Sequence, residues 1–158
     1  MAVRAPEIQS FTEFVESAAI RLRRALCVSL GREVGLEATS EALSYGWEHW
    51  ERVRDMDNPV GYLYRVGRSR ARRDLRWRRR TGPLFDPVAG DRLPWVEPDL
   101  PRVIGRLSES QRVAVVLRHA FDWTYAEVSD LMGVSISTVQ KHEERGMKKL
   151  RSGLGVQS

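Results

Sequence analysis

Apolar residues recur along this chain with the spacing of amphipathic helices, and the alternating runs that predict strands are nearly absent. Between Ser10 and Leu30 the apolar positions trace one helix face, and the segment GREVG that follows is predicted to break this helix. A second helix is predicted from Leu36 to about Val53. Asn58 followed by Pro59 is typical of an N-cap and a first helical turn, so a third helix is predicted to start there. The pattern therefore predicts an all-α fold.

A segment rich in proline and glycine divides the helical pattern into two parts. Residues 81–101 read TGPLFDPVAGDRLPWVEPDLP, with five prolines and two glycines. Proline at this density sustains neither a helix nor a sheet ladder. We therefore predict a helical domain at residues 10–80, a semi-extended linker at 81–100 and a second helical domain at 101–154.

The second predicted domain carries the start and stop signals of a helix-turn-helix. Ser108 with Gln111, and Thr124 with Glu127, have the spacing of capping boxes, and each pair precedes an apolar helical pattern. Gly133 suits the left-handed residue that ends the second of these helices, and a further helical pattern resumes within three residues. Two helices joined by so short a turn predict a helix-turn-helix.

The last helix, which Ser135 is predicted to cap, has the residue types of a helix that reads DNA. Small Ser129 stands on the preceding helix where the last helix would cross it. The apolar residues expected to hold the two helices together are Val128, Leu131, Met132, Val134 and Val139. Polar side chains early in the last helix can reach base edges, and basic ones further along suit phosphates. The predicted DNA-contacting residues are Ser137, Thr138, Gln140, Lys141, Arg145 and Lys148. Glu143 and Glu144 do not fit a phosphate-facing surface, and a plain helical corner is the alternative interpretation.

The basic charge of the chain is concentrated in one stretch. The net charge is +5, yet residues 65–80 alone hold nine arginines and one aspartate, and the rest of the chain is more acidic than basic. Tyr62, Tyr64 and Trp77 lie within or just before this stretch. Guanidinium groups bind phosphates through two bonds at once, and aromatic rings stack on bases. The stretch predicts contact with nucleic acid, with a solvated basic helix face as the alternative.

These features together resemble an extracytoplasmic-function (ECF) sigma factor of bacterial RNA polymerase, over nearly the whole chain from about Phe11 to Leu154. The more specific match is RLSESQRVAVVLRHAFDWTYAEVSDLMGVSISTVQKHEERGMKKLR, which resembles sigma domain four in its leader LS-x-x-QR-x-x-x-x-L and its hairpin EV-x-x-L-x-GVS-x-STV. EATSEALSYGWEHWERV resembles the polymerase-binding helix of sigma domain two. DNPVGYLYRVGRSRARRDLRWRRR resembles that domain's −10 loop and helix. At Glu143 the resemblance leads us to expect an apolar residue.

The resemblance implies an initiation factor that binds bacterial core RNA polymerase and promoter DNA. It assigns reading of the duplex −35 element to the last helix and the residues given above. For the single-stranded −10 element it implies Asp57, Asn58, Tyr62, Arg65, Ser69, Arg72 and Arg73. For core polymerase it implies Glu37, Ser40, Glu41 and Trp47. An anti-sigma factor is a further candidate partner, expected to act in trans because no additional domain follows the helix-turn-helix.

Other function classes find little support in the sequence. No apolar run approaches the roughly 20 residues of a membrane span, and the N-terminus lacks the apolar centre of a signal peptide, so a cytoplasmic protein without a membrane partner is predicted. The single Cys27 and the scattered His49, His119 and His142 form no metal or catalytic motif. We predict no enzymatic activity, no cofactor, no metal and no small-molecule substrate. A stand-alone helix-turn-helix regulator that binds duplex DNA without polymerase is the alternative function.

Overall fold

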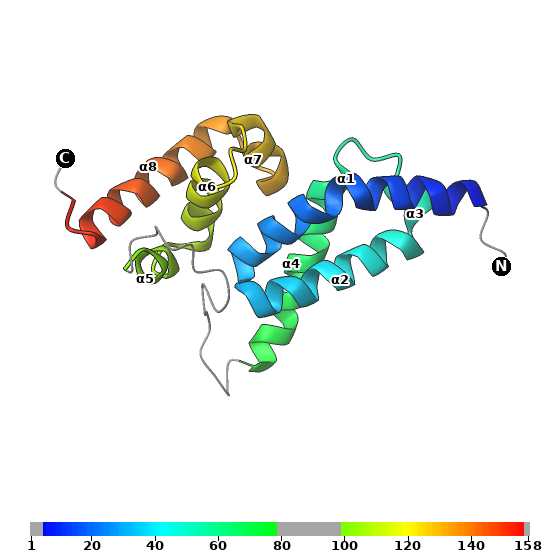
Figure 1. The fold of residues 1–158 in the computed structure, drawn as a ribbon, viewed down its shortest axis with the longest axis horizontal. Coiled ribbons are helices and arrows are strands. Elements are labelled where there is room, and N and C mark those ends of the chain that lie inside the picture. The colour runs from blue at the N-terminus through cyan, green and yellow to red at the C-terminus, as the bar shows by residue number, and fades with distance from the viewer. Residues whose placement is uncertain (1–4, 79–98, 157–158) are drawn as a thin grey trace.

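The computed structural model describes residues 5–78 and 99–156, and over these residues the chain forms helices and no strand (Figure 1). The first group of helices comprises α1 (Ala5–Leu30), α2 (Arg32–Glu48), α3 (Trp50–Val53) and α4 (Pro59–Arg78). The second group comprises α5 (Leu100–Gly105), α6 (Glu109–His119), α7 (Tyr125–Met132) and α8 (Ile136–Gly153). The predicted all-α fold is confirmed. The predicted linker lies almost wholly outside the described residues.

The first two helices form an antiparallel pair joined by one residue, Gly31 (Figure 1). Its φ of 86° is a left-handed conformation that glycine adopts without steric cost. The predicted break over GREVG is therefore wrong in extent, because the residues after Gly31 already belong to α2, and α1 begins at Ala5 rather than Ser10. The pair approaches closely at Gly35, where a Cβ would lie 2.5 Å from the Cα of Cys27.

The predicted second helix is interrupted at His49, whose φ of −115° and ψ of 25° are not helical. Its last turn is therefore the separate short helix α3. Asn58 caps α4 as predicted, because its Oδ1 accepts a hydrogen bond from the backbone N–H of Gly61 at 3.0 Å. The cap fixes where α4 begins, and with it the direction in which the arginine-rich helix leaves the loop.

The local signals predicted for the second group of helices are all present. The Ser108 hydroxyl accepts from the backbone N–H of Gln111 at 3.2 Å, and the Thr124 hydroxyl accepts from that of Glu127 at 3.1 Å. In return the backbone N–H of Thr124 donates to the Glu127 carboxylate at 2.7 Å, and this bond lowers the pKa of Glu127. Gly133 ends α7 with φ 68° and ψ 34°, the left-handed C-cap.

The two groups of helices share one continuous hydrophobic core. Leu22 of α1 and Leu63 of α4 are fully buried in the same cluster as Val113 and Leu117 of α6. A cluster that spans both groups means that each group covers apolar surface of the other.

Arg112 of α6 fastens the two groups together by hydrogen bonds. Its side chain is buried, and its Nε and Nη2 donate to the carbonyl oxygens of Val28 at 2.6 Å and Ser29 at 2.8 Å. Both carbonyls belong to the last turn of α1, where the carbonyls of a helix have no backbone N–H partner within the helix. A guanidinium at this end also complements the negative pole of the helix dipole.

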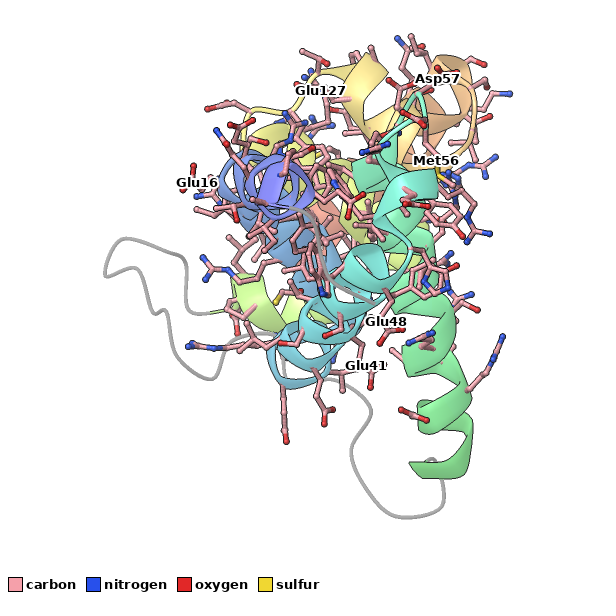
Figure 2. The ribbon with its side chains drawn as sticks, turned by 90° about the vertical axis from the view of Figure 1, so that its right-hand side faces the viewer. Glu16, Glu41, Glu48, Met56, Asp57 and Glu127 are labelled. Carbon is pink, nitrogen blue, oxygen red and sulfur yellow. The ribbon has the colours of Figure 1, made fainter. Side chains whose placement is uncertain are left out.

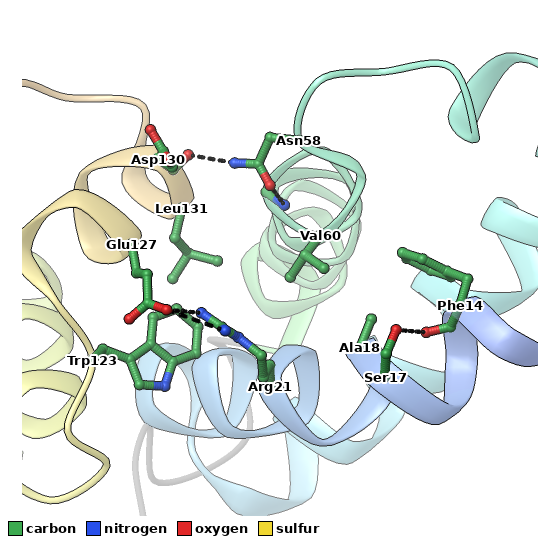
Figure 3. Close-up of a pocket in the computed structure, with 11 residues that line it drawn as sticks. Phe14, Ser17, Ala18, Arg21, Asn58, Val60, Trp123, Glu127, Asp130 and Leu131 are labelled. Carbon is green, nitrogen blue, oxygen red and sulfur yellow. Dashed lines mark hydrogen bonds and ion pairs between the residues drawn. The ribbon is translucent and has the colours of Figure 1, made fainter.

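A cavity of about 400 Å³ lies at the junction of α1, the start of α4 and α7 (Figure 3). Arg21 of α1 reaches across it, 3.3 Å from the Glu127 carboxylate and with its guanidinium 4.4 Å from the ring centre of Trp123. On the opposite wall the side-chain amide of Asn58 donates to the carbonyl of Asp130 at 3.0 Å. Polar contacts therefore join the two groups on both sides of the cavity.

Candidate nucleic-acid interface

The two helices α7 and α8 form the predicted helix-turn-helix, and Ser129 of α7 makes hydrogen bonds to the turn between them. The Ser129 carbonyl accepts from the backbone N–H of Gly133 at 2.9 Å, and its hydroxyl donates to the carbonyl of Val134 at 2.5 Å. The predicted apolar contacts are confirmed: Val128, Leu131 and Val139 are buried, and Met132 and Val134 pack against them from partly buried positions. The turn is thus closed by backbone bonds and held by apolar packing.

One face of α8 is buried and the other lies in solvent. The buried residues Val139, Glu143, Gly146 and Leu150 repeat with the spacing of one helix face. The predicted DNA-contacting residues lie on the rest of the helix. Ser137, Gln140, Lys141, Arg145 and Lys148 are exposed, and Thr138 is partly buried with its hydroxyl 2.8 Å from that of Ser135. The structure therefore brings the predicted set together on one accessible surface.

The arginine-rich helix α4 presents a second open surface. Tyr62, Ser69 and Arg73 follow one another at intervals of seven and four residues, so they share one face of the helix. Ser69 and Arg73 are exposed, and Tyr62 is half-buried. Asp57 projects from the loop before α4 (Figure 2), whereas the neighbouring Asn58 is turned into the helix cap.

Tyr62 belongs to a cluster of rings and arginines that sequence reasoning missed. Its hydroxyl lies 3.0 Å from that of Tyr45, and Arg52 donates to Tyr45 at 2.6 Å and to Tyr62 at 3.2 Å. His49 stacks on Tyr45 with ring centres 4.1 Å apart, and Arg70 lies 5.0 Å over the same ring. The bond between the two hydroxyls lowers the pKa of Tyr45 and raises that of Tyr62.

Two of the arginines predicted to bind the −10 strand are exposed but also contact the second group of helices. Arg72, together with Arg68, binds the carboxylate of Glu109 at the start of α6. Arg65 donates to the carbonyl of Leu131 at 3.4 Å. Burial disfavours the charged form of Arg68, but the hydrogen bond and charge of Glu109 outweigh it, so the pKa of Arg68 is raised. In this arrangement Arg65 and Arg72 are engaged within the chain.

The residues predicted to bind polymerase lie along α2. Glu37 and Ser40 are exposed and Glu41 is half-buried, while the ring of Trp47 packs against Phe11 with centres 5.2 Å apart. Figure 2 shows Glu41 at the far end of this side of the molecule from Asp57. The α2 surface and the loop before α4 are therefore separate surfaces.

Comparison with known protein families assigns the second group of helices. Residues 99–150 match the family described as Sigma-70, region 4. The match runs from the start of α5 through most of α8 and contains the whole helix-turn-helix.

The second group of helices belongs to the family Sigma-70, region 4.

The fold of the whole chain agrees with this assignment. The solved structure of the sigma factor RpoE from Bartonella quintana, in complex with the anti-sigma factor NepR, matches with a TM-score of 0.71 at 19% sequence identity. The match covers 94% of this chain and 98% of that chain, so the two share a fold over nearly their full length. A comparison with curated protein sequences finds no match. The predicted resemblance to an ECF sigma factor is confirmed by the region 4 match and the shared fold together.

In residues 5–78 and 99–156 of the chain, no three His, Cys, Asp or Glu side chains are grouped to hold a metal ion. None of its described helices combines the length and the apolar character needed to cross a membrane.

Within the region 4 helices, Glu143 and Glu144 have different surroundings. Glu144 is exposed. Glu143 has a side chain only 11% exposed, and it accepts hydrogen bonds from the Tyr125 hydroxyl and, at 2.8 Å, from the Nε2 of His119. The Nε of Arg118 lies 3.7 Å from the same carboxylate. The expectation that Glu143 opposes phosphate at the surface is therefore wrong, because its charge is directed inward and balanced there.

Proposed function

We propose that this chain is an ECF-type sigma factor that directs RNA polymerase to promoters by binding core enzyme and the −10 and −35 elements. The observation that carries the proposal is the exposed polar face of α8 within a region 4 helix-turn-helix. A second basic and aromatic surface lies on α4 of the same chain. A factor that recognises two promoter elements needs two such surfaces, whereas a reader of one duplex site needs only one.

The α8 helix is proposed to enter the major groove of the −35 element. A helix fits that groove, and polar residues near its N-terminus meet the base edges. Gln140 offers an amide suited to adenine and Lys141 an ammonium suited to guanine, and both are exposed. Arg145 and Lys148 lie one and two turns further along, where they suit phosphates. Ser137 and Thr138 complete the proposed contact surface.

The open face of α4 and the loop before it are proposed to hold the unpaired −10 strand. Bases without a partner strand stack on aromatic rings, and guanidinium groups follow the backbone. Tyr62, Ser69 and Arg73 lie on that face, with Asp57 and Asn58 at its start.

The cluster around Tyr45 extends this surface. Arg52 and Arg70 place positive charge beside the two tyrosine rings, which suits a base stacked between rings and a phosphate next to it. Arg65 and Arg72 join the surface once their bonds to the second group of helices are exchanged for bonds to phosphate.

The remaining roles follow from the family and from what lies exposed. We propose that residues 10–80 and 101–154 are the two promoter-binding domains, joined by the linker at 81–100. Core polymerase is proposed to bind along α2, at Glu37, Ser40, Glu41 and Trp47. An anti-sigma factor is a proposed partner, since the structurally similar RpoE was solved in complex with one. A protein with these partners acts in the cytoplasm.

In-vitro transcription with purified core polymerase and a library of promoter fragments tests the proposal. Core polymerase alone is the control, and adding the chain is expected to give initiation confined to fragments that share two sequence elements. A chain that binds duplex fragments by itself but gives no initiation with core polymerase would be a stand-alone regulator, and the sigma factor proposal would be lost.

A further inference from the structure

We infer that Glu143 is a positioning residue for the recognition helix. Its buried carboxylate fixes the rotation of α8 about its own axis, and so the direction in which Gln140 and Lys141 meet the base pairs. The inference rests on the proposed reading of the −35 element by α8.

The carboxylate of Glu143 joins α8 to both neighbouring helices at one point. Arg118 and His119 belong to α6, and Tyr125 opens α7. The hydrogen bonds from Tyr125 and His119 end on different carboxylate oxygens, Oε2 and Oε1. Two hydrogen bonds from different directions fix the orientation of the Glu143 side chain. A single hydrogen bond would leave it free to turn.

Arg118 supplies charge and holds Tyr125 in place. Its Nη1 donates to the carbonyl of Trp123 at 2.7 Å, and its guanidinium lies 3.9 Å over the ring of Tyr125. Among the described residues its buried Nε makes no hydrogen bond, and it lies 3.7 Å from the Glu143 carboxylate. The positive charge of Arg118 offsets the cost of burying the Glu143 carboxylate. The orientation of that carboxylate is set by the hydrogen bonds from Tyr125 and His119.

Other inward contacts of α8 add to this restraint. The Nζ of Lys149 donates to the side-chain oxygen of Gln111 on α6 at 3.1 Å, near the far end of α8. Val139 and Leu150 make apolar contacts, which have no preferred direction. At Gly146 the helix passes so close to α6 that a Cβ would lie 2.6 Å from a methyl carbon of Val115, and this sets the distance between the helices. A hydrogen bond, by contrast, weakens steeply as its angle departs from linear. A buried carboxylate that loses its donors is costly, so Glu143 opposes rotation of α8 at the turn next to Gln140.

Rotation of α8 translates directly into displacement of its outer face. Gln140 lies three residues, or about one turn, before Glu143. With side chains at a radius of about 6 Å, a rotation of about 20° moves a side-chain tip by roughly 2 Å. Side chains that bind base edges must be held within about 0.5 Å of their binding position. If the rotation of α8 is no longer fixed, sequence preference is therefore lost.

The test uses the full-length chain and two duplexes. One is the tightest duplex that the wild-type chain selects from a randomised library, and the other is a scrambled duplex of the same composition. The ratio of the two affinities measures sequence preference separately from general attraction to DNA. We expect Glu143→Gln and Tyr125→Phe each to lower this ratio roughly 3- to 30-fold. Their combination is expected to lower it less than the product of the two, because both break the same contact. The salt dependence of binding to the scrambled duplex is expected to stay unchanged.

Two variants control for charge and for stability. Glu144→Gln removes the same charge from the next residue of the same helix, but from an exposed side chain. Val103→Ala opens a gap in the small core around α5, away from the Glu143 contacts, and lowers stability. Both are expected to keep the wild-type ratio in the temperature range where circular dichroism shows them folded.

The outcomes separate this inference from the function it rests on. A Glu143→Gln chain that is folded and keeps the wild-type ratio overturns the positioning role and leaves −35 reading intact. If Glu143→Gln does not fold, Tyr125→Phe, which keeps both ring and carboxylate, decides in the same way. A wild-type chain that selects no duplex overturns −35 reading itself, and the inference with it.

Discussion

Replacement of Glu109 by glutamine is expected to strengthen the binding of single-stranded DNA by the isolated chain. In the structure one carboxylate at the start of α6 holds Arg68 and Arg72, and Arg72 is among the residues proposed to bind the −10 strand. DNA phosphates and Glu109 therefore compete for the same guanidinium groups. Removing the negative charge removes the competitor and keeps the side-chain shape.

The exposure of the three side chains sets the size of the effect. Glu109 is 21% exposed, Arg68 31% and Arg72 49%. The half-exposed Arg72 pair is screened by water and is worth about 0.2–1 kcal/mol. The more enclosed Arg68 pair is a charge-assisted hydrogen bond worth about 1.5–3 kcal/mol at most. Since the two share one carboxylate and do not add fully, we take about 1.5 kcal/mol, or roughly tenfold in affinity.

Fluorescence anisotropy of a labelled single-stranded oligonucleotide, titrated with the full-length chain at several salt concentrations, measures this effect. Each newly available guanidinium adds about 0.7 to the magnitude of the salt slope for single strands, so the slope is expected to steepen by as much as about 1.4. Glu16→Gln on the exposed side of α1 changes the net charge equally and serves as the control. If Glu109→Gln binds no more tightly than Glu16→Gln, the idea that Glu109 competes with DNA is refuted.

Three further predictions concern stability and sequence reading. Gly35→Ala is expected to lower the free energy of unfolding in urea by about 1–3 kcal/mol, because the new methyl group meets the α1 backbone at Cys27; a wild-type value contradicts this close approach. The pKa of Glu127 lies below its ordinary 4.5, so its contribution to stability is present above that pH and is lost as the pH falls through the lowered value. Glu127→Gln is therefore expected to make the free energy of unfolding decrease less steeply as the pH falls below about 5. An unchanged pH dependence in this range contradicts the prediction. Gln140→Ala is expected to change preference at one −35 base pair by about 1–3 kcal/mol in a binding-selection assay, whereas equal weakening on all duplexes would show that Gln140 reads no base.

Elements whose signals lie within a few residues could be predicted from the sequence. The capping boxes at Ser108 and Thr124 and the left-handed Gly133 each depend on neighbours three or four positions away, and all three are present. The predicted break over GREVG is too long, because its second glycine, Gly35, lies inside α2. Gly35 is tolerated inside α2 for a tertiary reason, the close approach to Cys27, which no local signal carries.

The surroundings of several site residues could not be predicted, because their partners are distant in the sequence. Glu143 and Glu144 are adjacent and chemically identical. Helical spacing from Val139 to Leu150 places Glu143 on the buried face, but the donors that balance its charge lie on α6 and α7. In the same way, the spacing along α4 could not show that Arg72 meets Glu109. Sequence reasoning therefore located the helices proposed to contact DNA better than it located what their individual side chains touch.

The end of α1 has a cap that comes from another part of the chain. The carbonyls of Val28 and Ser29 are satisfied by Arg112, more than eighty residues away in the sequence, so the last turn of one helix is completed only when the two groups are docked. Any bound form that draws the groups apart has to find other donors for those carbonyls, from water, polymerase or a further protein. Fraying of a single helical turn thus becomes the local sign of a rearrangement that involves the whole molecule.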